Sequence, residues 1–229
     1  QLAKTNPVRV SLLSGASLGY DTETQLALSD VIAKRIPFMA DAELRKSINT
    51  HKALYMDQHL SETHEMLNNK HFPKVHTALI EASSIDANGN IIPTTSVGNS
   101  ATFAALADEI IIEVNAAFPL EFNGIHDIYV PTEYPNREAV NVTHVDTRIG
   151  TNYIKVDPSK VVAVVLTNKP DAPAVISAPD EVTSAISKHI TAFFNKEVAE
   201  GRLTKWLMPL QAGIGKIANA VLSGLVHSD

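Results

Sequence analysis

The chain has 229 residues, of which 45% are apolar and 19% charged, and its formal net charge is −6. This composition is typical of a globular protein with a full core, and without a basic stripe nucleic acid is not expected as a partner. The absence of cysteine excludes disulfides, thiolate metal sites and a cysteine nucleophile. The longest apolar runs, such as residues 161–166, are far shorter than the roughly 20 residues of a membrane span, so we expect no membrane partner.

The first third of the sequence alternates between short apolar runs and segments with helical spacing. Three runs are typical of strands: residues 8–13, 36–39 and 53–56. Three segments have apolar residues at helical spacing: residues 22–33, 41–49 and 61–67. We expect Asp21 or Thr22 to cap the first of these helices and Asp41 to cap the second.

The middle third contains the most apolar strands. Residues 75–85 are typical of a central strand, and 86–90, which include Asn88-Gly89, favour a hairpin turn that returns through 91–93. A polar loop at 95–100 then begins a helix at 101–107, and 110–114 form the next buried strand. Residues 115–154 are irregular, and 161–167 are expected to be a last buried strand.

The last third begins with a linker at 168–177 that is rich in proline and alanine. Ser177-x-x-Asp180 is then expected to begin a long helix that ends at Gly201. Its apolar positions are expected to form one core face: Val182, Ile186, Ile190, Phe193, Phe194 and Val198.

The final segment is expected to run from a strand through a glycine loop into a helix. Residues 206–208 suit a short buried strand, the chain breaks at 213–215, and apolar residues from Ile217 onward recur at helical spacing. Such a junction directs free backbone N–H groups and the positive end of a helix dipole at one point, which suits an anion. The alternative is that the glycines only close a tight turn.

Strands that alternate with helices predict an α/β fold with a mostly parallel sheet flanked by helices. The first residues show no signal-peptide pattern, so we expect a cytoplasmic protein, or one of the mitochondrial matrix in a eukaryote.

Several stretches carry a resemblance to a known family. The glycine segment reads PLQAGIGKIANAVLSGL at 209–225, and further matches are DEIIIEVN at 108–115, IHDIY at 125–129 and DTRIGTNYI at 146–154, followed by VDP at 156–158 and KVV at 160–162. Together they resemble the acetyl-CoA hydrolase and class I CoA-transferase family, of the acetate, succinate and propionate type. Lys216 stands where that family usually has asparagine.

The resemblance implies a chain built from two similar α/β domains. Residues 1–178 would form most of the first CoA-transferase-type domain, without its opening strand and glycine loop. Residues 179–229 would form the connecting helix and the opening strand, loop and helix of the second domain.

The resemblance also implies acyl-CoA chemistry with small carboxylic acids. Coenzyme A would be a substrate, with no bound cofactor, and the nucleophilic glutamate would lie past Asp229, so no catalytic residue is expected in this chain. The oxyanion and CoA-binding positions would be Gly213, Ile214, Gly215, Lys216 and Ile217. Acetyl-CoA hydrolysis, or a CoA-binding fragment without activity, are the alternatives. We expect a homo-oligomer, or association with the missing C-terminal half.

Three other residue types are weaker candidates. Arg148 could bind a phosphate or carboxylate, or form a surface ion pair with Asp146 or Asp157. Glu113, on a buried strand, is expected to be a structural acid with a hydrogen-bond partner. The nine histidines show no His-Glu-x-x-His pattern, so no metal site is expected.

Overall fold

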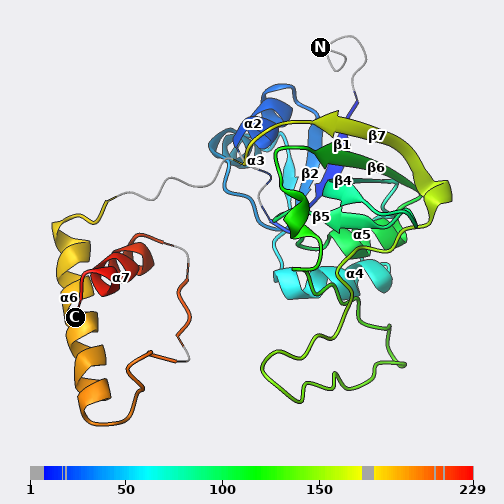
Figure 1. The fold of residues 1–229 in the computed structure, drawn as a ribbon. Helices are drawn as coiled ribbons and strands as arrows, with labels where there is room; N and C mark the ends of the chain where they lie inside the picture. The colour runs from blue at the N-terminus through cyan, green and yellow to red at the C-terminus, as the bar shows by residue number, and fades with distance from the viewer. Residues whose placement is uncertain are drawn as a thin grey trace. The chain divides into compact units, whose positions relative to one another are not determined.

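The computed structural model describes residues 8–16, 18, 20–171, 178–208, 210–213 and 215–228. The chain divides into two compact units, Gln1–Asp171 and Ala172–Asp229, here called unit 1 and unit 2 (Figure 1). Each unit is described by itself.

Unit 1 contains a small parallel sheet, sheet A, built from the first strands of the chain. Its order is β1 (Val10–Leu13), β2 (Ile32–Ile36) and β3 (Leu54–Tyr55). Helix α2 (Tyr20–Leu28) connects β1 to β2, and α3 (Ala42–Asn49) connects β2 to β3. The predicted strand at 8–13 and the predicted helix at 41–49 are therefore confirmed.

The cap of α3 follows the sequence prediction, whereas the bounds of α2 do not. The Asp41 carboxylate accepts the Leu44 amide at 2.8 Å, as an N-cap residue should. The helix predicted at 22–33 ends at Leu28, because Ile32 and its neighbours pair with β1 instead. Asp21 and Thr22 lie inside α2 rather than at its cap. The strand predicted at 36–39 is wrong: β2 runs from Ile32 to Ile36, and Pro37 has no N–H to donate to a ladder.

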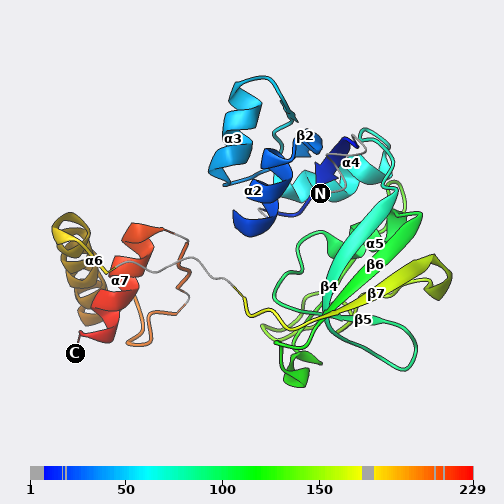
Figure 2. The same ribbon diagram turned by 90° about the horizontal axis from the view of Figure 1, so that it is seen from above.

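The larger sheet, sheet B, has the order β5-β4-β6-β7 (Figure 2). Its strands are β4 (Thr77–Ile85), β5 (Ile91–Pro93), β6 (Glu109–Asn115) and β7 (Val161–Thr167). Strands β4, β6 and β7 are parallel, while β5 returns antiparallel through the predicted hairpin turn, where Gly89 has φ +82°. The mostly parallel α/β architecture is therefore confirmed.

One core joins sheet B to α5 (Ser100–Leu106), through buried side chains that include Ile80, Ile112 and Ala104. A second cluster joins sheet A to α4 (Thr63–Asn68) and α5: Ile36 of β2 packs with Leu67 of α4, next to Phe103 of α5. A 3₁₀ turn (Leu60–Glu62) precedes α4. Val75 and Phe103 pack against both of these clusters, so the two cores adjoin.

Strand β7 is not the buried strand that its apolar sequence predicts. It lies at the edge of sheet B, and five consecutive side chains from Val162 to Leu166 are exposed, Leu166 to 79%. An edge strand has one neighbour instead of two, and no described helix covers its outer side.

The predicted irregular segment after β6 is present. Apart from short 3₁₀ turns (Leu120–Phe122 and Pro158–Lys160), its pairing is limited to isolated bridges, Ile128 with Thr151 and Ile91 with Ile154. Part of it forms the open loop that projects below α4 in Figure 1. We call residues 123–157 the strap.

Unit 2 contains two packed helices, α6 (Glu181–Ala199) and α7 (Lys216–Val226). Asp180 begins α6 with a capping box that includes Thr183, whereas Ser177 of the predicted motif lies outside the described residues. The buried Ser187 hydroxyl donates to the Ala220 carbonyl at 2.9 Å. A Cβ on Gly224 would overlap that hydroxyl and would lie 3.6 Å from the Thr191 hydroxyl. Ser187 thus contacts Ala220, and Thr191, four residues later, contacts Gly224, four residues after Ala220. The two helices therefore run in the same direction.

Two expectations for unit 2 are wrong. Val182 and Phe193, expected on the core face of α6, are exposed, because small polar residues make the contact with α7 instead. Residues 206–208 form a turn and coil rather than a buried strand, and Trp206 is 71% exposed. No strand exists among the described residues of unit 2 to pair with them. Across the described parts of both units, no helix is long and apolar enough to span a membrane.

Candidate functional site

The predicted oxyanion segment lies at the start of α7. Gly215 is its N-cap residue, with φ +146° and no side-chain cap, and its carbonyl accepts the Asn219 amide at 3.0 Å. Gly213, Lys216 and Ile217 are exposed, while Ile214 lies outside the described residues. The first amides of a helix have no partner within it, so the amides that follow Gly215 are accessible donors.

Lys216 lies close to the start of the neighbouring helix. The hydrogen bonds from Thr183 hold the pKa of the Asp180 carboxyl below its usual range, and the positive charge of Lys216 lowers it further. The charge of Lys216 therefore acts on the carboxylate that caps α6.

Arg148 does not form either of the ion pairs expected for it, with Asp146 or Asp157, in the described part of the chain. Its Nη1 donates to the carbonyl of His126 at 2.7 Å. Arg148, which could bind an anion according to its sequence, thus connects the two ends of the strap through this hydrogen bond.

The strap brings together two of the sequence motifs that carry the family resemblance. The Asp127 carboxylate accepts the Ile149 amide and, at 2.7 Å, the Gly150 amide. Ile128 and Thr151 exchange both backbone hydrogen bonds, and a Cβ on Gly150 would overlap the Ile128 carbonyl. Sequence spacing alone does not reveal this pairing, since the two motifs lie about twenty residues apart in a loop.

A polar network lies at the carboxyl ends of the parallel strands in sheet B. The Glu81 carboxylate accepts the Thr94 hydroxyl at 2.7 Å and the Asn115 amide group at 2.9 Å. Glu113, which is in register with Glu81, accepts the Thr167 hydroxyl at 2.9 Å. This partner supports the interpretation of Glu113 as a structural acid.

The Thr94 carbonyl, in turn, lies 2.9 Å from Nε2 of the buried His126. Because a carbonyl only accepts, Nε2 carries the proton, and Nδ1 is buried without a partner. The hydrogen bond to Thr94 therefore fixes the orientation of the ring.

A cavity of about 210 Å³ opens beside this network. One wall is formed by the Gly98 and Asn99 loop and the first turn of α5, and the other by the strap from Asp127 to Pro131. His64 of α4 joins the walls, with Nδ1 2.9 Å from the Thr102 hydroxyl and Nε2 3.2 Å from the Pro131 carbonyl. These contacts of His64 were not predicted, and no local sequence pattern around it indicates them.

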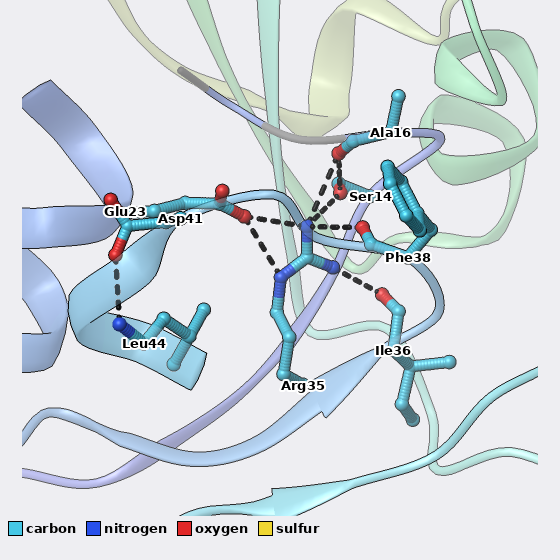
Figure 3. Close-up of polar contacts among 8 residues, drawn as sticks. All are labelled: Ser14, Ala16, Glu23, Arg35, Ile36, Phe38, Asp41 and Leu44. Atoms are coloured by element: carbon cyan, nitrogen blue, oxygen red, sulfur yellow. Dashed lines mark hydrogen bonds and ion pairs between the residues drawn. The ribbon is translucent and has the colours of Figure 1, made fainter. Parts of the chain in front are cut away.

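Sheet A has a buried charged cluster at the same end of its strands (Figure 3). The guanidinium of Arg35 pairs with Glu23 at 2.7 Å, and both side chains are 0% exposed. It also donates to Ser14 Oγ at 2.8 Å and to the carbonyls of Ile36 and Phe38 at 2.6 and 3.0 Å. This pair could not be predicted from the sequence, because an arginine and a glutamate twelve residues apart match no known spacing pattern.

The ligand-binding edge of an open parallel α/β sheet is the one at the carboxyl ends of its strands. In unit 1 this edge holds the Arg35 cluster, the Glu81 network and the cavity. No group of three or more side chains suited to a metal ion occurs among the described residues.

The fold is that of CoA-transferases. A 4-hydroxybutyrate CoA-transferase from Porphyromonas gingivalis superposes with a TM-score of 0.52 at 13% identity, over 98% of this chain and 49% of that one. RipA from Yersinia pestis gives the same TM-score at 15% identity, over 98% of this chain and 52% of its own.

Sequence comparison identifies the family. Residues 1–166 match the model of the acetyl-CoA hydrolase/transferase N-terminal domain. The chain is 42% identical to a succinyl-CoA:acetate CoA-transferase from Clostridium kluyveri, over 96% of this chain and 41% of that protein. It is 43% identical to an acetyl-CoA hydrolase from Schizosaccharomyces pombe, over 96% of this chain and 43% of that one. It is also 35% identical to a propanoyl-CoA:succinate CoA transferase from Escherichia coli, over 96% and 44%.

The chain belongs to the acetyl-CoA hydrolase/transferase family, as the resemblance in its sequence predicted. It spans less than half the length of these curated relatives.

Proposed function

We propose that this chain is part of an acyl-CoA:carboxylate CoA-transferase that acts on acids of the acetate, succinate and propionate class. The observation that carries the proposal is the 42% identity to a succinyl-CoA:acetate CoA-transferase along 96% of the chain. Coenzyme A is a substrate in this scheme, exchanged between two small carboxylic acids.

The reaction would proceed by ping-pong transfer. A glutamate carboxylate, expected past Asp229, attacks the thioester carbonyl, the C–S bond breaks, and an acyl-glutamyl anhydride and the CoA thiolate form. The thiolate then attacks the glutamyl carbonyl and releases the first acid. The resulting glutamyl-CoA thioester reacts with the second acid by the reverse of these two steps.

Each addition in this scheme passes through an oxyanion, which needs donors that are already oriented. The amides at the start of α7 are suited to this role, since they lack partners in the helix. No atom of the described residues lies within 4 Å of a Cβ built on Gly213 or Gly215, so a thioester can approach the backbone closely.

The test is a time course of thioester loss by the full-length enzyme that contains this chain. With succinyl-CoA, we expect loss only when acetate is added, with acetyl-CoA as the product. Loss at the same rate without acetate would contradict the transferase and indicate a hydrolase.

Acetyl-CoA hydrolysis is the second candidate, with water in place of the acceptor acid. It is favoured by relatives named acetyl-CoA hydrolase, among them those of Schizosaccharomyces pombe and Neurospora crassa at 43% and 40% identity. The 229-residue chain alone is expected to be inactive in both assays, because the nucleophilic glutamate is expected past Asp229. Turnover by the isolated chain near the rate of the full-length enzyme would contradict that expectation.

A further inference from the structure

We propose that Arg35 is a positioning residue. Its buried side chain holds the loops after β1 and β2 in place, and Gly15, in the first of these loops, holds in place the Gly98 and Asn99 loop that lines the 210 Å³ cavity. Its consequence for catalysis rests on the proposed function, whereas its effect on the cavity wall does not.

The first observation is the burial of a complete ion pair. Arg35 and Glu23 are 0% exposed, with Nη2 and Nε of the guanidinium 2.7 and 3.0 Å from one Glu23 oxygen. Removing two charges from water is costly, and well-packed apolar residues are often as stable in such a position. The pair therefore contributes geometry rather than a large net stability.

The second observation is that the other hydrogen-bond acceptors of Arg35 come from two different loops. Arg35 donates to Ser14 Oγ and, at 3.2 Å, to the Ala16 carbonyl, both in the loop after β1. It donates to the Ile36 and Phe38 carbonyls at the end of β2. Figure 3 shows these acceptors around the single planar guanidinium. The two hydrogens of Nη2 are shared among Glu23 and acceptors in both loops, so the guanidinium connects the two loops to each other.

The third observation is the contact that this arrangement makes possible. Gly15 lies between two of the Arg35 acceptors, and a Cβ built on it would be 3.0 Å from the Asn99 nitrogen and 3.1 Å from the Gly98 Cα. Gly98 has φ +42°, a conformation that favours glycine. The two loops thus meet backbone to backbone, with no flexible side chain between them to absorb a shift.

The Gly98 and Asn99 loop lines the cavity directly, opposite Asp127 of the strap. A displacement of Ser14 to Ala16 therefore moves a cavity wall that Arg35 does not touch. Since protein interiors are close-packed, such a shift is transmitted rather than dissipated.

The first test uses hydrogen exchange on the 229-residue chain with Arg35→Lys and Ser14→Ala. We expect exchange at residues 97–102 to rise on the order of tenfold along with that at 14–16, while β4, β6 and unit 2 keep wild-type rates. Arg9→Lys is the matched control, because Arg9 is an exposed arginine that donates to the Ile32 carbonyl of the same sheet. Faster exchange at residues 14–16 together with unchanged exchange at residues 97–102 would overturn the proposal.

Gly15→Ala retains every Arg35 partner, so it provides an independent test if Arg35→Lys unfolds unit 1. We expect it to change exchange at 97–102 without changing that at 34–38. If 97–102 exchange as in the wild type, the coupling through Gly15 does not exist and the proposal fails.

The second test measures kinetics in the full-length enzyme, with rates normalised to the folded fraction. We expect kcat to fall on the order of 10- to 100-fold for Arg35→Lys and Gly15→Ala, with a smaller change in KM for acyl-CoA. A purely structural role would lower the amount of folded enzyme and leave the normalised kcat unchanged, which would refute the catalytic consequence. A wild-type enzyme without thioester turnover would refute the proposed function, while hydrogen exchange would still decide the positioning role.

Discussion

Gly150 lies directly against the Ile128 backbone in the strap, with no room for a side chain. We expect Gly150→Ala to lower the stability of unit 1 by about 2 kcal/mol, because the added methyl group overlaps the Ile128 carbonyl and must displace backbone. Thermal unfolding of the chain, followed by near-ultraviolet circular dichroism, measures this effect. Gly213→Ala is the control, since a Cβ there meets no described atom within 4 Å. Equal melting temperatures for the two variants would contradict the close contact.

A second prediction concerns Gly213 and Gly215, the two glycines before α7, of which only Gly215 has a positive φ. We expect Gly213→Val and Gly215→Val to slow the full-length enzyme, because a branched side chain blocks close approach of a thioester to the backbone. The loss should be greater for Gly215, whose φ of +146° is unsuited to other residues. Displacing one oxyanion donor costs about 3 kcal/mol of transition-state stabilisation, so kcat is the quantity to measure. Folded variants with wild-type kcat would show that the segment is only a turn.

At the scale of elements, the start of α6 depends on one ionised carboxylate. Hydrogen bonds from Thr183, with help from Lys216, lower the pKa of Asp180 in the folded chain. A lowered pKa stabilises the folded state fully above the pKa of an unfolded aspartate, about 3.9. That contribution is lost as the pH falls through the lower folded value. We therefore expect the Thr183 amide to lose protection only in acid.

An NMR titration of the Thr183 amide from pH 6 to pH 2 checks this expectation. In Asp180→Asn, the side chain still accepts the cap hydrogen bond but does not titrate in this range, so the pH dependence should disappear. A midpoint at or above 3.9 in the wild-type chain would contradict the lowered pKa.

Most elements of unit 1 could be predicted from the sequence because their signals are local. The Asp41 cap and the Asn88-Gly89 turn each specify their own backbone geometry. The end of α2 could not be predicted, since the pairing of Ile32 with Val10 overrides helical spacing. The burial of β7 depends on what lies beside the strand, which its apolar sequence does not contain.

The candidate site was less predictable than the fold. The glycine segment at the start of α7 could be found because glycines and a helical pattern adjoin in sequence. The Arg35 cluster and the His64 contacts join residues from separate elements, at separations of up to 67 positions. Their partners are determined by packing, which no spacing rule describes.

At the scale of the whole molecule, unit 2 leaves much of its apolar surface uncovered. Ile217 of α7 is 51% exposed and Val226 is 81% exposed, while Trp206 and Met208 are exposed in the preceding coil. Several large exposed apolar side chains on one small unit are typical of a protein interface. The helix contact itself uses the small residues Ser187 and Gly224, so it leaves the larger side chains free for another partner.

We therefore expect the 229-residue chain to self-associate, with Ile217, Val221 and Leu225 in the contact and Trp206 and Leu207 beside it. Light scattering over a concentration series should show a mass above 24.7 kDa that rises with concentration. Ile217→Ser should shift association to higher concentration by weakening the apolar contact. Leu120→Ser is the control, because Leu120 is also an exposed apolar residue but lies in unit 1. A strict monomer at high concentration, with Trp206 shielded from a soluble quencher, would instead show that the segment folds back on its own chain.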